Sequence, residues 1–158
     1  MRMAEGVEWA LHSCVNLSWL DGHGPVPAAR LAGLYDLPAP YLNKQLQALV
    51  RAGVLTSVSG PRGGFRLARA PEEISLLDVV VAVEGPEEAF RCTQILRNGP
   101  GGDESIDYRS HCAVSQSMRR ADLAWRRELA ARTIADVGHD VVAHTPAAAE
   151  RVRAALTS

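Results

Sequence analysis

The feature that most constrains the fold is a change of hydrophobic period between residues 26 and 68. Apolar residues follow a helical period in Val26–Leu34 and again in Tyr41–Ala52, and a turn with two prolines separates the two segments. Directly afterwards, Val54–Val58 and Phe65–Ala68 are predicted strands around a glycine-containing turn. Two short helices followed at once by a hairpin predict a winged helix-turn-helix, a mainly helical α+β fold with a two-stranded wing.

Further helices are predicted from their apolar periods over Val7–Leu20, Ile74–Val83 and Ala147–Leu156. Met118–Val137 is predicted to be one long amphipathic helix, with an apolar stripe formed by Leu123, Leu129, Ile134 and Val137. Because such a stripe needs a surface to cover it, we expect this C-terminal helix to pair with the same helix of a second chain in a homodimer.

The expected organisation has three parts. Residues 1–85 form the winged helix-turn-helix domain, and residues 86–113 form a cysteine-bearing sensor loop without a convincing period. Residues 114–158 supply the dimerisation helix and a C-terminal tail.

Charge is segregated along the chain although the formal net charge is only −1. No acidic residue occurs between Asp36 and Glu72, whereas one lysine and four arginines do: Lys44, Arg51, Arg62, Arg66 and Arg69. This segregation predicts a positive surface on the helix-turn-helix and wing, which favours a polyanionic partner such as double-stranded DNA.

The candidate DNA-reading residues lie on the second helix and the wing. Tyr41, Asn43, Lys44 and Gln47 occupy the polar side of that helix near its N-terminal end, the end that reaches base edges in a major groove. Amide side chains bond adenine, and lysine bonds guanine or a phosphate. In the wing, we expect Arg62 and Arg66 to contact phosphates or the minor groove, and Gly63 and Gly64 to let the backbone approach closely.

Several functional classes are excluded by what the sequence lacks. It has no catalytic serine motif, phosphate-binding loop or HExxH zinc motif, so we expect no enzyme. It has no apolar run long enough for a membrane span and no secretory signal pattern, which predicts a cytoplasmic protein. Its three cysteines do not form a secreted disulfide framework, and Cys14, within an apolar period, is predicted to be a core residue.

The DNA-binding half of the chain resembles the Rrf family of bacterial winged-helix regulators, typified by IscR and NsrR. The resemblance rests on Tyr41-Leu42, Ala52-Gly53-Val54-Leu55, Gly63-Gly64-Phe65 and the sequence ISLLDVV of the helix that begins near Ile74. It implies a homodimeric transcription repressor that binds a partly palindromic operator.

The chain also resembles the RsrR-like branch of that family, with which it shares the stretch Gly6–His12 and both loop cysteines. This resemblance implies a redox-sensing two-iron, two-sulfur (2Fe–2S) cluster, held by Cys92 and Cys112 of one chain and by Glu8 of the other. The branch supplies a histidine where this chain has Tyr35. The fourth ligand is therefore open between Tyr35, His12 and His111.

Other functions for the loop cysteines stay open at this point. Many family members carry three closely grouped cysteines in this loop, whereas this chain has two that form no CxxC motif. Cys92 and Cys112 are therefore candidates for cluster ligands, for a thiol–disulfide switch, or for no sensing role. A winged-helix module that binds proteins instead of DNA is a further alternative, against which the charge segregation argues.

Overall fold

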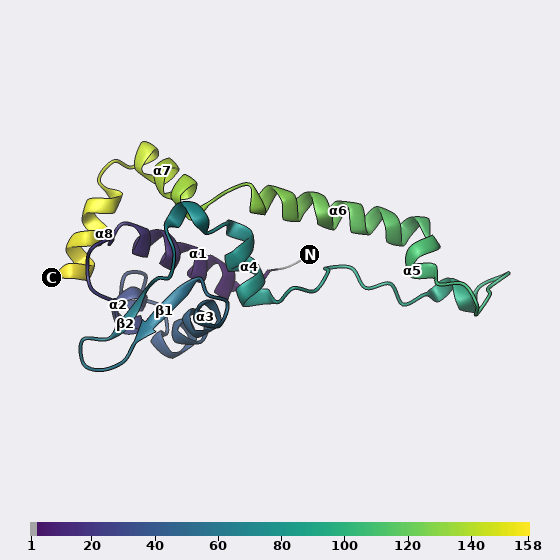
Figure 1. Ribbon diagram of the computed structural model, residues 1–158, viewed down its shortest axis with the longest axis horizontal. Coiled ribbons are helices and arrows are strands. Elements are labelled where there is room, and N and C mark those ends of the chain that lie inside the picture. The colour runs from purple at the N-terminus through teal and green to yellow at the C-terminus, as the bar shows by residue number, and fades with distance from the viewer. Residues whose placement is uncertain (1–2) are drawn as a thin grey trace.

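The computed structural model describes residues 3–158, and an arm projects from one side of its helical body (Figure 1). The arm consists of the helix α6 (Ala113–Ala130), the short helix α5 (Tyr108–His111) and the segment that runs out to them from the body. That segment contains the 3-10 turn η2 (Ile95–Asn98). Every other helix and strand described below belongs to the body.

The predicted helix-turn-helix is confirmed. Helix α1 (Glu5–Ser18) packs against α3 (Ala39–Arg51), and α2 (Ala28–Gly33) lies beside α3 across a short turn. Proline precedes both short helices and another occupies the first turn of α3, where its fixed φ suits a helix start. The core between them is built from fully buried leucines, each contributing about 1.5–3 kcal/mol through burial: Leu31, Leu42, Leu46 and Leu49.

The predicted wing is also confirmed. Strands β1 (Leu55–Val58) and β2 (Gly64–Leu67) pair antiparallel, with Leu55 opposite Leu67. Val26 and Phe65 exchange two backbone hydrogen bonds of 2.9 and 2.8 Å, which fix the hairpin to the chain just before α2. The orientation of the wing relative to the helix-turn-helix is therefore set by backbone pairing as well as by apolar packing.

Helix α4 (Leu76–Glu84) follows a 3-10 turn, η1 (Pro71–Glu73), and begins with a capping box. The Ser75 side chain accepts a hydrogen bond from the Asp78 N–H, and the Asp78 carboxylate accepts one from the Ser75 N–H. This reciprocal pair satisfies two backbone donors that the first helical turn leaves without partners.

The prediction of one helix over Met118–Val137 is wrong, because the helix is broken between Ala130 and Ile134. A second capping box, formed by Thr133 and Asp136, starts α7 (Ile134–His144) at this break. The chain there also bridges back to α4, with the Leu76 N–H donating to the Arg132 carbonyl at 2.9 Å. Pairing with the backbone before α4 and the new cap together end one helix and start the next.

The break changes the predicted apolar stripe. Ile134 is fully buried and Val137 packs against the same core, because α7 lies on α1 in the body. Leu123 remains exposed on α6, and Leu129 is half-buried. The last helix, α8 (Ala148–Thr157), matches its prediction. Residues 134–158 thus complete the body, whereas the sequence assigned them to a dimerisation element and tail.

Among the helices of residues 3–158, none combines the length and apolarity that crossing a membrane requires.

Candidate nucleic-acid interface and cysteine loop

The exposed side of α3 carries the predicted reading residues. Tyr41, Asn43 and Lys44 are exposed and Gln47 is half-buried, whereas Leu42 and Leu46 point into the core. The helical repeat places these two sets on opposite sides of one helix. The polar side is accessible to a partner, and its contact with DNA stays a prediction.

The beginning of α3 is in contact with α1 through an aromatic pair. The rings of Trp9 and Tyr41 meet edge to face, with centroids 5.7 Å apart and an interplanar angle of 72°. Tyr41 is nevertheless 56% exposed, so more than half of this residue remains accessible to a ligand or solvent. Trp9 is the residue directly after Glu8, which is a candidate cluster ligand.

The turn of the wing exposes Arg62 but not Gly63. Gly63 is buried, and a Cβ at this position would lie 2.1 Å from the Val58 carbonyl oxygen. At Gly64, with φ of +149°, a Cβ would lie 2.3 Å from the Val26 carbonyl carbon. The close approach that these glycines permit is therefore to the chain's own backbone. Any approach of the wing backbone to DNA stays a prediction.

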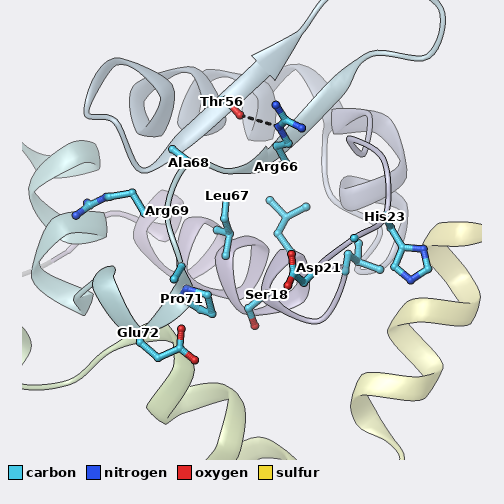
Figure 2. Close-up of a pocket in the computed structure, with 14 residues that line it drawn as sticks. Ser18, Asp21, His23, Thr56, Arg66, Leu67, Ala68, Arg69, Pro71 and Glu72 are labelled. Carbon is cyan, nitrogen blue, oxygen red and sulfur yellow. Dashed lines mark hydrogen bonds between the residues drawn. The ribbon is translucent and has the colours of Figure 1, made fainter.

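A cleft of about 880 Å³ lies at the base of the wing, between β2 and the C-terminal end of α1 (Figure 2). The Arg66 Nε donates to the Thr56 hydroxyl across the hairpin at 3.3 Å, and Arg69 bonds the Glu73 carbonyl at 3.0 Å. Asp21 and Glu72 also line this cleft. Arg66 is held on the exposed face of the wing, whereas Arg69 is engaged with the chain itself.

Cys92 and Cys112, the two loop cysteines, lie close enough to line the same hollow of the arm. The hollow measures about 250 Å³, and Phe90, Ile95 and Val114 contribute to its apolar lining. Both thiols are half-buried and neither is in a disulfide. Cys112 is the residue immediately before α6, so its position is fixed by the start of that helix.

Glu8 and His12 line a different hollow, of about 370 Å³, on the surface of α1. They are one helical turn apart and both are exposed. The Tyr35 hydroxyl lies 3.0 Å from the Asn16 Nδ2 and 3.2 Å from the Asn16 Oδ1, both within hydrogen-bonding distance. The centroid of its ring lies 5.9 Å from that of the His12 ring. His111 belongs to the arm, where its Nδ1 lies 3.0 Å from the Asp107 carbonyl oxygen.

The two sets of candidate ligands do not meet within one chain. Over residues 3–158, no group of three or more histidine, cysteine, aspartate or glutamate side chains is placed to hold a metal ion. Cys14 is fully buried in the core, as predicted, and its burial raises the pKa of the thiol to about 12. It is therefore protonated and shielded from reagents.

Two polar residues of α6, Asp122 and Arg126, are functional candidates that the sequence did not reveal. They form an ion pair of 2.6 Å and together bond the backbone of the segment that leads to Cys92. Their i, i+4 spacing is common on helix surfaces, so spacing alone gives no sign of this role.

Comparison with known proteins places this geometry among transcription regulators. The family model described as Rrf2, iron-dependent transcriptional regulator, matches residues 3–140. An HTH-type regulator of Synechocystis sp. is 33% identical over 57% of this chain and 61% of its own length. IscR of Aliivibrio salmonicida is 30% identical over 58% of this chain and 55% of its own length. The matches thus span less than two thirds of these relatives.

A solved structure shows the same fold. The oxidized form of Staphylococcus aureus CymR superposes with a TM-score of 0.64 at 25% identity, covering 87% of this chain and 96% of that one. The named relatives are regulators and not enzymes.

Proposed function

Because the chain belongs to the Rrf2 family of transcription regulators, we propose that it is a homodimeric repressor that responds to redox conditions through Cys92 and Cys112. Its targets on this proposal are partly palindromic operators, read by two copies of α3 and the wing. The observation that carries the sensing part is the shared hollow of the two cysteines in the arm.

Operator reading is supported by the accessible side chains of α3 and the wing. Asn43, Lys44 and Arg62 are exposed on elements that enter or flank the grooves in other winged helix-turn-helix proteins. Half or more of the bonds in such complexes go to phosphates and sugars, which suits the arginines of the wing. Direct discrimination between bases then falls to Asn43, Lys44 and Gln47.

A homodimer is supported by the composition of the arm. Between residues 86 and 131 only Ser115 is buried, so the arm has no apolar core of its own. Large apolar side chains of α6 remain exposed, among them Val114 at 63% and Met118 at 42%. A second chain that covers them would remove this apolar surface from water.

An iron–sulfur cluster, 2Fe–2S in our proposal, fits the chemistry of the two hollows. Thiolates bind such clusters strongly, and carboxylate and imidazole groups also bind iron. The resemblance to the RsrR-like branch implies Cys92 and Cys112 of one chain with Glu8 of the other, and we propose this set because these side chains line separate hollows within one chain. When bound, the cluster supplies a one-electron redox change in the accessible range of potentials.

For the fourth ligand, the surroundings favour His12 over Tyr35 and His111. His12 lines the hollow that contains Glu8, and Tyr35 does not. The Tyr35 hydroxyl is, in addition, already bonded to Asn16. His111 lies in the arm, where its Nδ1 is already bonded to the Asp107 carbonyl oxygen. A carboxylate and an imidazole one turn apart on a rigid helix are a preorganised pair of donors.

A route from this site to the DNA-reading helix is present in the body. Glu8 and Trp9 are consecutive in α1, and the Trp9 ring contacts Tyr41 at the start of α3. A change in what Glu8 binds thus occurs next to Trp9, whose side chain packs on α3. For the switch to work, the two states of the sensor must differ in operator affinity.

A thiol–disulfide switch is the second candidate, and the same observation favours it. Two half-buried free cysteines in one hollow can form a disulfide without metal. A relative of known structure, CymR of Staphylococcus aureus, has been solved in an oxidized form. The cluster and the disulfide both use Cys92 and Cys112 but differ in their need for Glu8.

Iron and acid-labile sulfide analysis of anaerobically reconstituted protein separates the two. For a cluster, the wild type should hold two irons and two sulfides per site, as expected of 2Fe–2S. Cys92→Ala, Cys112→Ala and Glu8→Ala should each lose them, whereas Glu150→Ala, which removes an exposed carboxylate of α8 that lines neither hollow, should not. Wild-type protein that holds no iron, yet forms a Cys92–Cys112 disulfide under mild oxidant, would replace the cluster by the thiol switch.

A further inference from the structure

The arm holds its two cysteines together without a hydrophobic core. The segment between α4 and α5 runs out along the arm and projects past α5 before it turns back (Figure 1). Ser115 is the one buried residue between positions 86 and 131. Burial of apolar side chains therefore contributes little to the position of the cysteine loop relative to α6. Polar bonds between the loop backbone and α6 must define it instead.

These bonds are gathered at two points. Near the start of α6, the Ser115 hydroxyl donates to the Arg109 carbonyl at 2.9 Å, and the Gln116 amide donates to the Ser110 carbonyl at 2.7 Å. Both accepting carbonyls lie just before Cys112. This first point fixes Cys112.

The second point is one ion pair of α6, Asp122 with Arg126. The Arg126 guanidinium donates to the Pro86 carbonyl at 3.0 Å and the Glu87 carbonyl at 2.9 Å, while the Asp122 carboxylate accepts from the Ala89 N–H at 3.5 Å. Only 8% of the Asp122 side chain and 21% of the Arg126 side chain are exposed. A partly buried pair with several backbone partners is held far more firmly than an exposed one.

We propose that Asp122 and Arg126 are positioning residues that keep Cys92 in register with Cys112. Ala89 is three residues before Cys92, and three residues of fully extended chain span about 10 Å. Fixing residues 86–89 against the middle of α6 therefore limits where Cys92 can lie along the arm. Without the pair, the half-exposed Glu88–Arg119 ion pair and the hydrogen bond from the Tyr108 N–H to the Gln94 side chain remain near Cys92. Because an exposed ion pair holds little, we expect the effective concentration of one thiol at the other to fall.

The inference rests on the proposed function, in which the two cysteines act together, but it is independent of whether they bind a cluster or form a disulfide. Arg126→Lys is the sharpest variant. It keeps the charge but replaces two separate donors, Nε on the Asp122 carboxylate and Nη2 on the Pro86 and Glu87 carbonyls, by a single ammonium group. Arg127→Lys is the matched control, because Arg127 is the next residue of α6 and its side chain is exposed.

The first measurement is the rate at which a short bifunctional maleimide links Cys92 to Cys112 in the metal-free chain, read by mass spectrometry of digests. Cys14 does not compete because it is fully buried. In Arg126→Lys we expect the ratio of cross-linked to singly labelled product to fall about tenfold. In Arg127→Lys we expect this ratio to stay the same. Equal cross-linking in wild type and Arg126→Lys would overturn the proposal. This result is obtained even if neither cysteine proves to be a sensor.

The second measurement is the reduction potential of the Cys92–Cys112 pair in a thiol buffer, taken together with hydrogen exchange, because unfolding of the arm would raise the potential as well. A tenfold lower effective concentration makes the disulfide easier to reduce, so the potential should rise by about 30 mV in Arg126→Lys. Asp122→Asn should raise it too, because the pair loses its charge. An unchanged potential in both variants, with the arm still folded by hydrogen exchange, would also overturn the proposal.

Discussion

At the scale of single residues, the arginines between Asp36 and Glu72 differ in the contacts that their side chains make within the chain. Arg69 is engaged by the Glu73 carbonyl and by Asp78 at 3.6 Å, and Arg66 bonds Thr56 across the hairpin. Arg62 stands exposed at the turn of the wing. The sequence groups the three as one positive surface, but only the structure shows that Arg69 is committed to the fold. Of the three, Arg62 is the best placed to meet a phosphate.

Arg62→Ala is therefore expected to weaken binding to operator and unrelated DNA alike, and to reduce the salt dependence of affinity by about one phosphate contact. Asn43→Ala should instead relax preference at one base position by about 1–3 kcal/mol. Competition gel shifts over a salt series, with operators changed one base at a time, measure both. Arg151→Ala on α8 is the control, and salt-independent binding of wild type would contradict the assignment.

Gly63 offers a test of how the wing is built. In Gly63→Ala the new Cβ would be driven into the Val58 carbonyl oxygen, so the hairpin turn must open. We expect a loss of about 1–3 kcal/mol in the free energy of unfolding and weaker operator binding. Gly33→Ala is the control, because a Cβ there meets nothing within 4 Å. Urea denaturation and gel shifts would contradict this reasoning if both variants matched wild type.

At the scale of elements, the sequence predicted the helix-turn-helix and the wing because their periods change sharply at prolines and glycines. It failed at the end of α6 because Leu129, Ile134 and Val137 continue a helical period across the break. A signal was present: Thr133 and Asp136 have the spacing of a capping box. The apolar period spans more residues than this cap, and the bridge from this point to α4 depends on tertiary pairing that no local pattern reports.

Thr133→Ala tests that junction. It removes the hydroxyl that accepts from the Asp136 N–H at 3.1 Å, and loss of such a cap costs about 1 kcal/mol of unfolding free energy. Thr145→Ala, at the other end of α7, is expected to cost much less. Urea denaturation at pH 7 compares them. Equal stability of the two variants would mean that the bridge to α4, and not the cap, starts the helix.

The same cap predicts a dependence on pH. Hydrogen bonds from the backbone and then from the side chain of Thr133 lower the pKa of Asp136 below its ordinary 3.8. A lowered folded-state pKa means that the carboxylate stabilises the fold above pH 3.8 and that this contribution is lost as pH falls through the folded-state value. Asp136→Asn should therefore be less stable than wild type at pH 7, and the gap should narrow in acid. A gap that stays constant down to pH 2 would contradict the linkage.

At the scale of the whole molecule, the two hollows that contain the proposed ligands lie on different parts, one on the arm and one on α1 of the body. Sequence spacing did not reveal this separation, because a chain position says little about which surface a loop residue faces. The arm also exposes an apolar stripe on α6, consisting of Val114, Met118 and the half-buried Trp125. Steps of four and seven residues keep these side chains on one face. If a second chain lies antiparallel along the stripe, the far end of each arm points toward the body of the other chain, which contains α1 (Figure 1).

If two chains pair along this stripe, Met118→Asp should yield monomers, because a carboxylate would be buried without a partner. Loss of the dimer should abolish operator binding, since one half-site alone binds too weakly. It should also abolish iron binding, since Glu8 comes from the other chain in our proposal. Leu123→Asp is the matched variant: Leu123 is 53% exposed and lies about 140° around the helix from Met118. Sedimentation and gel shifts should find it dimeric and active. If Leu123→Asp is monomeric while Met118→Asp pairs normally, the chains meet on the opposite face of α6.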